Sequence, residues 1–111
     1  MLVIGSFIYL LFSYFFSDVQ INKYTDMAAV KDQNAIKEGW VPSILPPSAY
    51  EITETHDIDK NELFGNFKYK EKDEANFLKQ LTPKTPEIQQ WDNFLFKVDT
   101  KLNLVQFRNK L

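Results

Sequence analysis

The first 17 residues of the chain, from Met1 to Ser17, carry no charged side chain and consist mainly of large apolar and aromatic residues. A helix of this length reaches about 25 Å, close to the roughly 30 Å thickness of the hydrocarbon core of a bilayer. A segment that is apolar on every side is difficult to bury within a small domain. We therefore expect residues 1–17 to form a transmembrane anchor.

Two other interpretations of this segment stay open. A cleaved signal peptide needs basic residues before the apolar run and small residues at the cleavage site. No Lys or Arg precedes the run, and the bulky Phe15 lies two positions before Ser17. A buried core helix would have to be covered on all sides by the rest of the chain. Lys23 and Lys31 follow the segment, so the positive-inside rule favours a cytoplasmic domain behind the anchor.

All charged residues follow this segment, and their balance limits the kinds of partner. The 13 Lys and Arg against 15 Asp and Glu give a formal net charge of −2. Binding to the phosphates of nucleic acid requires a positive surplus, so we expect no nucleic-acid partner. The chain has no cysteine, which excludes a disulfide framework, a thiolate nucleophile and a Cys-ligated zinc. The sequence suggests no cofactor.

The rest of the chain shows the signals of a short linker (18–24) followed by one small α+β domain (25–111). Helices are predicted over 25–30 and 73–81, because each stretch starts at a residue that can cap a helix. Between them, residues 39–49 contain three prolines and several apolar residues. We expect this stretch to be a loop that packs across the domain.

Two hairpins are predicted from the alternation of apolar and polar residues around turn sequences. The first joins residues 50–58 to 63–70, and the second joins residues 94–98 to 102–108. The order helix, hairpin, helix, hairpin is typical of a four-stranded antiparallel sheet covered by helices on one face. The predicted fold class is therefore α+β, with an N-terminal transmembrane helix followed by this four-stranded domain with short helices.

The stretch between the two helices also carries a pattern made of Gly39-Trp40-Val41-Pro42, Leu45-Pro46, Ser48-Ala49, Ile52, His56 and Asp59. In these residues the chain resembles small uncharacterised bacterial envelope proteins, which are lipoproteins or single-pass membrane proteins. The resemblance implies a fold and an extracytoplasmic domain but no activity, and it assigns no functional residue. The chain departs from the lipoprotein members of this group because it lacks the anchoring Cys.

A small polar group surrounds the only histidine of the chain, His56, with Glu54 and Asp57 beside it on the same predicted strand. Such residues can act as acid and base, but neither a nucleophile nor an oxyanion hole accompanies them in the sequence. We therefore predict no catalytic or metal-ligating set, and we keep His56, Glu54 and Asp57 as a candidate polar site. The alternative is a strand histidine that is hydrogen-bonded locally across the hairpin.

The chain is rich in aromatic residues, with 10 Phe, 5 Tyr and 2 Trp. Several of them lie opposite the apolar neighbours on their strands, and an exposed aromatic patch marks a surface for a partner. The candidate interaction surface consists of Trp40, Phe64, Phe94 and Phe107. The alternative is a sheet with apolar cores on both faces.

These observations together predict a single-pass, membrane-tethered and non-enzymatic domain that binds another protein or an envelope component. An inhibitor or immunity-like role is one version of this hypothesis. The expected partners are the bilayer, through residues 1–17, and a protein or envelope component. Two alternatives are a small hydrolase or ligand-binding enzyme centred on His56 and a structural small membrane protein.

Overall fold

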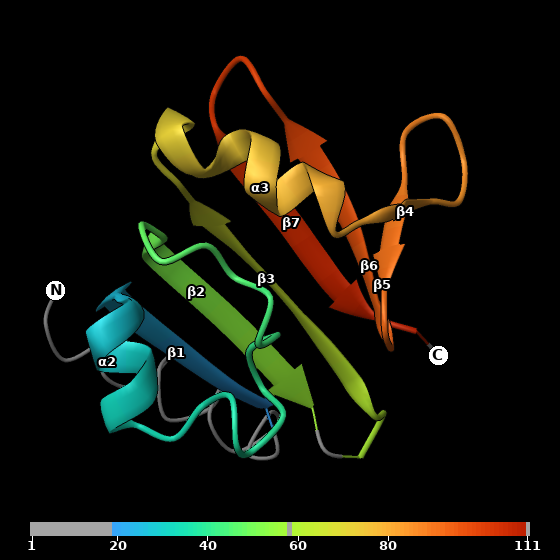
Figure 1. Cartoon of the computed structure of the whole chain (residues 1–111). Helices are drawn as coiled ribbons and strands as arrows, with labels where there is room; N and C mark the ends of the chain where they lie inside the picture. The colour runs from blue at the N-terminus through green and yellow to red at the C-terminus, as the bar shows by residue number, and fades with distance from the viewer. Residues whose placement is uncertain (1–18, 58, 111) are drawn as a thin grey trace, which may run out of the picture.

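An antiparallel sheet dominates the computed structural model, which describes residues 19–57 and 59–110 (Figure 1). Within these residues the sheet has seven strands in the order β1-β2-β3-β7-β6-β5-β4. The strands are β1 (Val19–Asp26), β2 (Tyr50–Asp57), β3 (Glu62–Lys68), β4 (Thr82–Pro83), β5 (Gln89–Trp91), β6 (Phe94–Asp99) and β7 (Leu104–Asn109). The helices are α2 (Met27–Asp32), the single 3-10 turn η1 (Glu71–Asp73) and α3 (Glu74–Lys79).

Both hairpins expected from the sequence are present. Strands β2 and β3 pair around the turn at residues 59–61, and strands β6 and β7 form the second hairpin. The two hairpins join through β3 and β7, where Phe64 lies opposite Arg108 and Lys68 lies opposite Leu104. The four strands expected from the sequence therefore form the centre of the sheet.

The prediction of a four-stranded sheet behind a transmembrane helix is nevertheless wrong, because three more strands extend the sheet. Strand β1 lies at one edge, where residues 18–24 were expected to be a linker, and β5 and β4 lie at the other edge. The inward side of β1 carries Gln20 and Asn22, so no alternation of apolar and polar residues marks this strand. Strands β4 and β5, with 2 and 3 residues, are too short to show a periodic pattern.

The predicted anchor, residues 1–17, lies outside the described residues. Within residues 19–57 and 59–110 the two α-helices have 6 residues each, and no helix there is long and apolar enough to span a bilayer. For the part of the chain that the structure describes, this finding contradicts the expectations of a transmembrane helix and of a single-pass membrane localisation.

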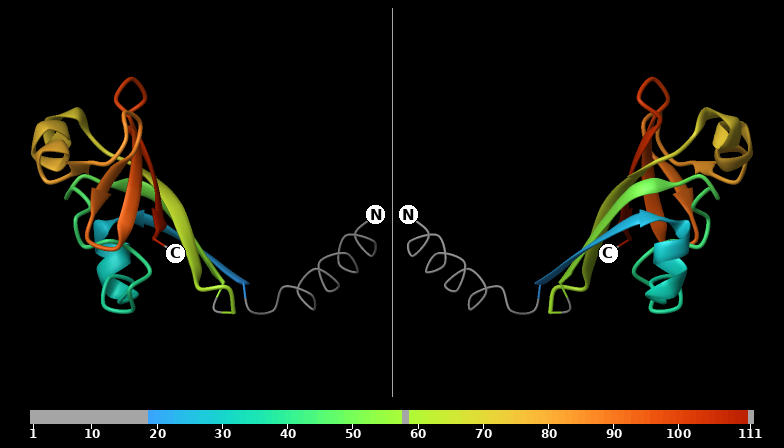
Figure 2. Two further views of the ribbon diagram at one scale, coloured as in Figure 1. Left: turned by 90° about the vertical axis from the view of Figure 1, so that its right-hand side faces the viewer. Right: turned by 90° about the vertical axis from the view of Figure 1, so that its left-hand side faces the viewer.

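The helices lie on one face of the sheet, together with the proline-rich loop (Figures 1 and 2). Helix α2 starts after Asp26, whose carboxylate accepts a hydrogen bond from the backbone N–H of Ala29 (3.0 Å). This bond satisfies one of the free N–H groups of the first turn. The helix predicted here is present, but its cap lies one residue after the expected Thr25.

The loop at residues 39–49 packs across the domain as expected. It runs in front of the sheet in Figure 1, and its side chains Val41, Ile44, Leu45 and Ala49 are buried. The three prolines of this loop prevent a regular helix. Its buried apolar side chains hold it against the sheet.

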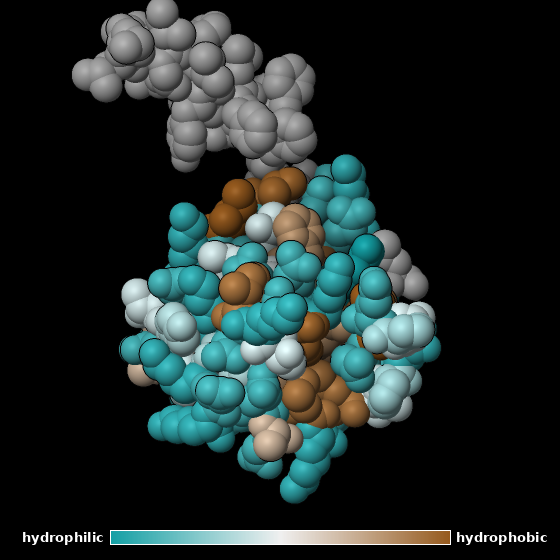
Figure 3. Space-filling model, turned by 90° about the horizontal axis from the view of Figure 1, so that it is seen from above, coloured by the Kyte–Doolittle hydropathy of each residue, from teal (hydrophilic) through white to brown (hydrophobic). Residues whose placement is uncertain are grey.

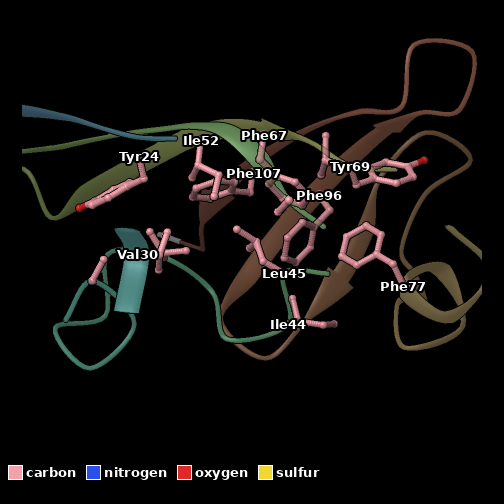
Figure 4. Close-up of a cluster of buried hydrophobic side chains, with 14 of the residues drawn as sticks. Tyr24, Val30, Ile44, Leu45, Ile52, Phe67, Tyr69, Phe77, Phe96 and Phe107 are labelled. Carbon is pink, nitrogen blue, oxygen red and sulfur yellow. The ribbon is translucent and has the colours of Figure 1, made fainter. Parts of the chain in front are cut away.

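A cluster of buried side chains fills the space between the sheet and these elements (Figure 4). Phe77 of α3 meets Phe67 of β3 and Phe96 of β6 edge to face, with ring centroids 5.8 and 6.1 Å apart. This geometry is favourable for aromatic pairs because the positive edge of one ring meets the negative face of the other.

Apolar residues also reach the surface of the molecule. Figure 3 shows them from above as separate patches among hydrophilic side chains. On the face of the sheet that points away from the cluster, Ile21 and Phe64 keep 65% and 51% of their surface exposed.

Strand β2 is irregular near its start. Its register with β3 shifts between Tyr50 and Thr53, and Glu51 has a φ of 47°. Near this place the two backbones approach closely, because a Cβ on Gly65 of β3 would overlap the carbonyl oxygen of Thr53 and lie 2.7 Å from Cζ of Phe107. The absence of a side chain at Gly65 therefore allows β2 and β3 to pack as they do.

Candidate functional site

A pair of polar residues lies on the buried face of β2. Glu54 and His56 alternate with outward residues along the strand and share the inward face with Ile52. Their exposed fractions are 0% and 5%, so both are withdrawn from water. Burying such groups is costly unless they are hydrogen-bonded, and the partners of this pair therefore define the site.

The carboxylate of Glu54 holds the pair together. Nδ1 of His56 lies 3.0 Å from Oε2 and 3.1 Å from Oε1 of Glu54. Asn22, which lies opposite Glu54 in the register of β1 with β2, donates a hydrogen bond from Nδ2 to Oε1. An ionised carboxylate only accepts hydrogen bonds. Nδ1 of His56 therefore carries a hydrogen, and in the neutral form of the ring the lone pair is on Nε2.

Tyr24 lies on the same side of β1 as Asn22, and the carboxylate of Glu54 also affects its pKa. Burial raises the pKa of Tyr24, and the nearby negative charge of Glu54 raises it further. The phenol therefore stays neutral well above physiological pH, and it adds no second charge to this part of the core.

Trp40 covers the histidine ring from the side of the loop. The two rings stack with centroids 4.6 Å apart and planes inclined by 16°. Gly39, directly before Trp40, has a φ of 84°, in the left-handed region that glycine adopts easily. This turn brings the indole of Trp40, which is half-buried, over His56.

The second ring nitrogen of His56 has no partner. Nε2 is buried and makes no hydrogen bond within residues 19–57 and 59–110. An unsatisfied buried polar atom costs about 1–3 kcal/mol, and such an atom in a folded protein calls for an explanation. His56 is also one of the residues that line a pocket of 480 Å³.

The pocket lies at one end of the sheet, where the end of β2, the start of β3, the turn between β5 and β6 and the end of β7 meet the loop that carries Trp40. Four carboxylates line it, from Glu38, Asp57, Glu62 and Asp92, and none of its lining residues is a Lys or an Arg. The other lining residues are Gly39, Trp40, His56, Asn61, Leu63, Asn93, Phe94 and Asn109. The wall is therefore acidic with aromatic and amide groups between the carboxylates.

Asn109, at the end of β7, fixes one wall of this pocket. Its Oδ1 accepts a hydrogen bond from the backbone N–H of Leu63 (3.0 Å), and its Nδ2 donates to the backbone carbonyl of Asn61 (2.7 Å). These two bonds hold the start of β3 against the end of β7. The pocket is thus built across the junction of the two hairpins.

The structure brings two of the three predicted polar residues into direct contact. Glu54 and His56 form the buried pair, whereas Asp57 follows on the opposite side of β2 and accepts a hydrogen bond from the backbone N–H of Lys60 (3.3 Å). Asp57 nevertheless lines the same pocket as His56. No group of three or more His, Cys, Asp and Glu side chains in the described part of the chain is arranged to hold a metal ion.

The four aromatic residues predicted as an interaction surface do not share one surface. Trp40 and Phe94 line the pocket beside His56. Phe64 lies on the other face of the sheet, and Phe107, with 2% of its surface exposed, belongs to the buried cluster. Trp40 and Phe94 therefore lie at one place and Phe64 at another, and Phe107 is too buried to belong to an interaction surface.

Sequence reasoning missed Asn22 and Tyr24 as partners of Glu54, because β1 was taken for a linker. It also missed the acidic wall, since Glu38, Glu62 and Asp92 are far apart along the chain. No short-range sequence signal joins these three residues.

The chemistry of this site centres on the ring of His56. The carboxylate of Glu54 makes Nε2 of His56 a hydrogen-bond acceptor and a base. Among the described residues, none that lines the pocket is a Ser, Thr, Cys or Lys, the side chains that most often act as nucleophiles beside a base.

The fold and the site together define a small, mainly β domain with one antiparallel sheet covered on one face and an acidic pocket at the sheet's end. Residues 18–68, somewhat less than half of the chain, match the family model described as the YbbD head domain. This match spans β1 to β3, and so it includes Glu54, His56 and Trp40. The chain has no match among the curated proteins or the solved structures. The resemblance to small bacterial envelope proteins stays a prediction.

Proposed function

We propose that this chain is a non-enzymatic binding domain that captures a cationic side chain of a protein partner in the pocket beside His56. The observation that carries the proposal is the unpartnered Nε2 of His56, which is buried at the wall of a pocket lined by four carboxylates. Inhibition of the partner, or immunity against it, is one consequence that such capture would have.

Charge selects the class of ligand. Four carboxylates without a lining Lys or Arg produce a negative potential that attracts a cation and repels an anion. The basic residues next to lining residues along the chain, Lys37, Lys60, Arg108 and Lys110, are exposed and do not line the pocket. A guanidinium or ammonium group would neutralise part of this charge.

Hydrogen bonding selects a donor. The neutral ring of His56 offers a lone pair at Nε2, and a guanidinium or ammonium group has donors but no acceptor. The half-buried indole of Trp40 and the ring of Phe94 supply aromatic faces in the same pocket. Arginine suits such a wall best. Its planar guanidinium group stacks on aromatic rings and donates hydrogen bonds in its own plane.

The direct test is a titration of the chain with N-acetyl-arginine amide, followed by 1H–15N NMR. We expect shifts of backbone signals around Trp40, His56 and Phe94. The neutral isostere N-acetyl-citrulline amide has the same shape without the charge, and it should give no saturable shifts. Equal binding of citrulline amide, or arginine-dependent shifts confined to other parts of the sheet, would contradict the proposal.

Variants separate the pocket from general charge effects. His56→Phe keeps a ring beneath Trp40 but removes Nε2, and we expect it to abolish saturable binding. Glu62→Gln should weaken binding by about 2- to 5-fold, the effect of one exposed ion pair. Glu87→Gln is the matched control, because Glu87 is exposed and does not line the pocket. A Glu87→Gln variant that binds as weakly as Glu62→Gln would show that net charge alone governs the interaction.

A further inference from the structure

A groove of 640 Å³ lies on the face of the sheet that points away from His56. Strands β3, β7 and β6 form its floor with two neighbouring rows of side chains. Cross-strand pairing places Phe64, Arg108 and Leu95 in one row and Asn66, Gln106 and Lys97 in the next. Ile88, from the segment before β5, adds to the lining.

The first property of this groove is its apolar surface. Phe64 keeps 51% of its surface exposed, and Leu95 and Ile88 are only partly buried. Covering such side chains releases roughly 25 cal/mol for each Å² of apolar surface removed from water. An apolar side chain of a partner therefore gains free energy by entering the groove.

The second property is its charge, which is opposite to that of the pocket beside His56. Lys97 and Arg108 line the groove, and no carboxylate from the described part of the chain does. Both cations are exposed, and neither forms an ion pair with any residue in the described ranges. A partner that places a carboxylate next to its apolar group would match this arrangement.

The third property is a pair of free side-chain amides. Asn66 and Gln106 face each other across β3 and β7, both are exposed, and neither side chain makes a hydrogen bond within residues 19–57 and 59–110. A primary amide offers both a donor and an acceptor, which is the complement of a peptide backbone. A fatty-acid tail would leave these groups without partners.

From these three properties we infer that the groove over Phe64, Leu95 and Arg108 is a second binding site, which takes a protein segment with a bulky apolar side chain flanked by Asp or Glu. The apolar side chain would lie against Phe64 and Leu95. Its acidic neighbours would pair with Lys97 and Arg108, and its backbone would bond to Asn66 and Gln106. This site is independent of the pocket beside His56 and would engage a different part of a partner, or a different partner.

The test is a 1H–15N NMR titration of the chain with peptides of matched length. The probe Ser-Asp-Leu-Asp-Ser should shift backbone signals of β3, β6 and β7 around the groove. The probe Ser-Lys-Leu-Lys-Ser reverses the charge and Ser-Asp-Ser-Asp-Ser lacks the apolar side chain, and each should bind the groove at least about 5-fold more weakly. Equal binding of either control peptide at the groove, followed by the signals of β3, β6 and β7, would overturn the inference.

Variants connect the binding to the named residues. Lys97→Glu should weaken binding of Ser-Asp-Leu-Asp-Ser by about 5-fold or more. Lys79→Glu, on α3, makes the same charge change at an exposed residue outside the groove and should bind as the unaltered chain does. Phe64→Ser removes an exposed side chain, so the fold should persist while binding is lost. Unchanged binding by Lys97→Glu or Phe64→Ser would overturn the inference.

Two other occupants are distinguished by the same measurements. Decanoate carries an apolar chain and a carboxylate without a peptide backbone. If it produces the same shifts with equal or higher affinity, the groove takes amphiphiles and the inference is wrong. If groove signals shift with protein concentration alone, and Phe64→Ser removes this dependence, the occupant is a second copy of the chain and the inference is likewise wrong.

Discussion

Glu54→Gln tests whether the buried carboxylate sets the hydrogen position on His56. The substitution preserves the volume of the side chain, and its remaining oxygen can still accept the hydrogen bond from Asn22. The new amide N–H₂ then faces Nδ1 of His56, which already carries a hydrogen in the unaltered chain. Two donors cannot bond to each other, so the ring is expected to move its hydrogen from Nδ1 to Nε2.

The size of the effect follows from the contacts that change. A hydrogen bond to a charged group contributes about 1.5–3 kcal/mol, while removal of a buried charge recovers part of its desolvation cost. We therefore expect a net loss of about 1–2 kcal/mol in the free energy of unfolding. A loss of this size lowers the Tm of a domain this small by about 4–8 °C for each kcal/mol.

The assay combines urea unfolding with a long-range 1H–15N correlation of the imidazole ring. Because His56 is the only histidine of the chain, the ring signals need no further assignment. At a pH where the ring is neutral, the unaltered chain should show hydrogen on Nδ1 and the variant should show it on Nε2. The variant should also lose capture of arginine amide, since Nε2 then donates instead of accepting.

Glu51→Gln provides the matched control on the same strand. Glu51 is exposed and forms an ion pair with Lys68 at 2.9 Å, so its neutralisation should cost at most about 1 kcal/mol. It should leave the histidine ring unaltered. If Glu54→Gln retains both the hydrogen on Nδ1 and the full stability of the chain, the assigned role of the carboxylate is refuted.

Two further predictions concern the fold around the site. Gly65→Ala should destabilise the chain by about 1–3 kcal/mol or more, as urea unfolding will show, because its Cβ would overlap the Thr53 carbonyl; an unchanged midpoint would contradict the close approach of β2 and β3. Hydrogen bonds from the Ser48 side chain and backbone hold the pKa of Asp73 below its usual 3.8. These bonds therefore stabilise the folded chain above pH 3.8, and this stabilisation is lost as the pH falls through the folded-state pKa of Asp73. Unfolding measured across that acidic range should therefore be less pH-dependent in Asp73→Asn than in the unaltered chain, and an identical pH dependence would refute the contribution of Asp73.

The central hairpins could be predicted because most of their inward residues are apolar and lie two residues apart around turn sequences, although β2 also carries Glu54 and His56 on its inward face. Strand β1 could not, because Gln20 and Asn22 occupy inward positions on it. Asn22 is polar there since it serves the buried carboxylate of Glu54. The polar residue that the site requires on β1 therefore interrupts the apolar alternation from which this strand could have been predicted. Local sequence patterns are expected to fail at functional sites of this kind.

The candidate site was predictable only in part. Glu54 and His56 are two residues apart on a strand, so alternation places them on one face, and the structure brings them into contact. The stacking of Trp40 on His56 and the convergence of Glu62 and Asp92 depend on how loops and hairpins meet in space. Sequence periodicity contains no information about such contacts between residues that are far apart along the chain.

The seam between β3 and β7 has a consequence for how the chain reaches its native state. Each hairpin closes through neighbours in sequence, but β3 gains its second neighbour only when residues such as Arg108 pair back to Phe64. Contacts of such high sequence separation slow folding, since a long loop must close before they form. On the ribosome, β1 to β3 would therefore emerge with a bare strand edge, and nascent chains would be prone to aggregation until β7 is synthesised.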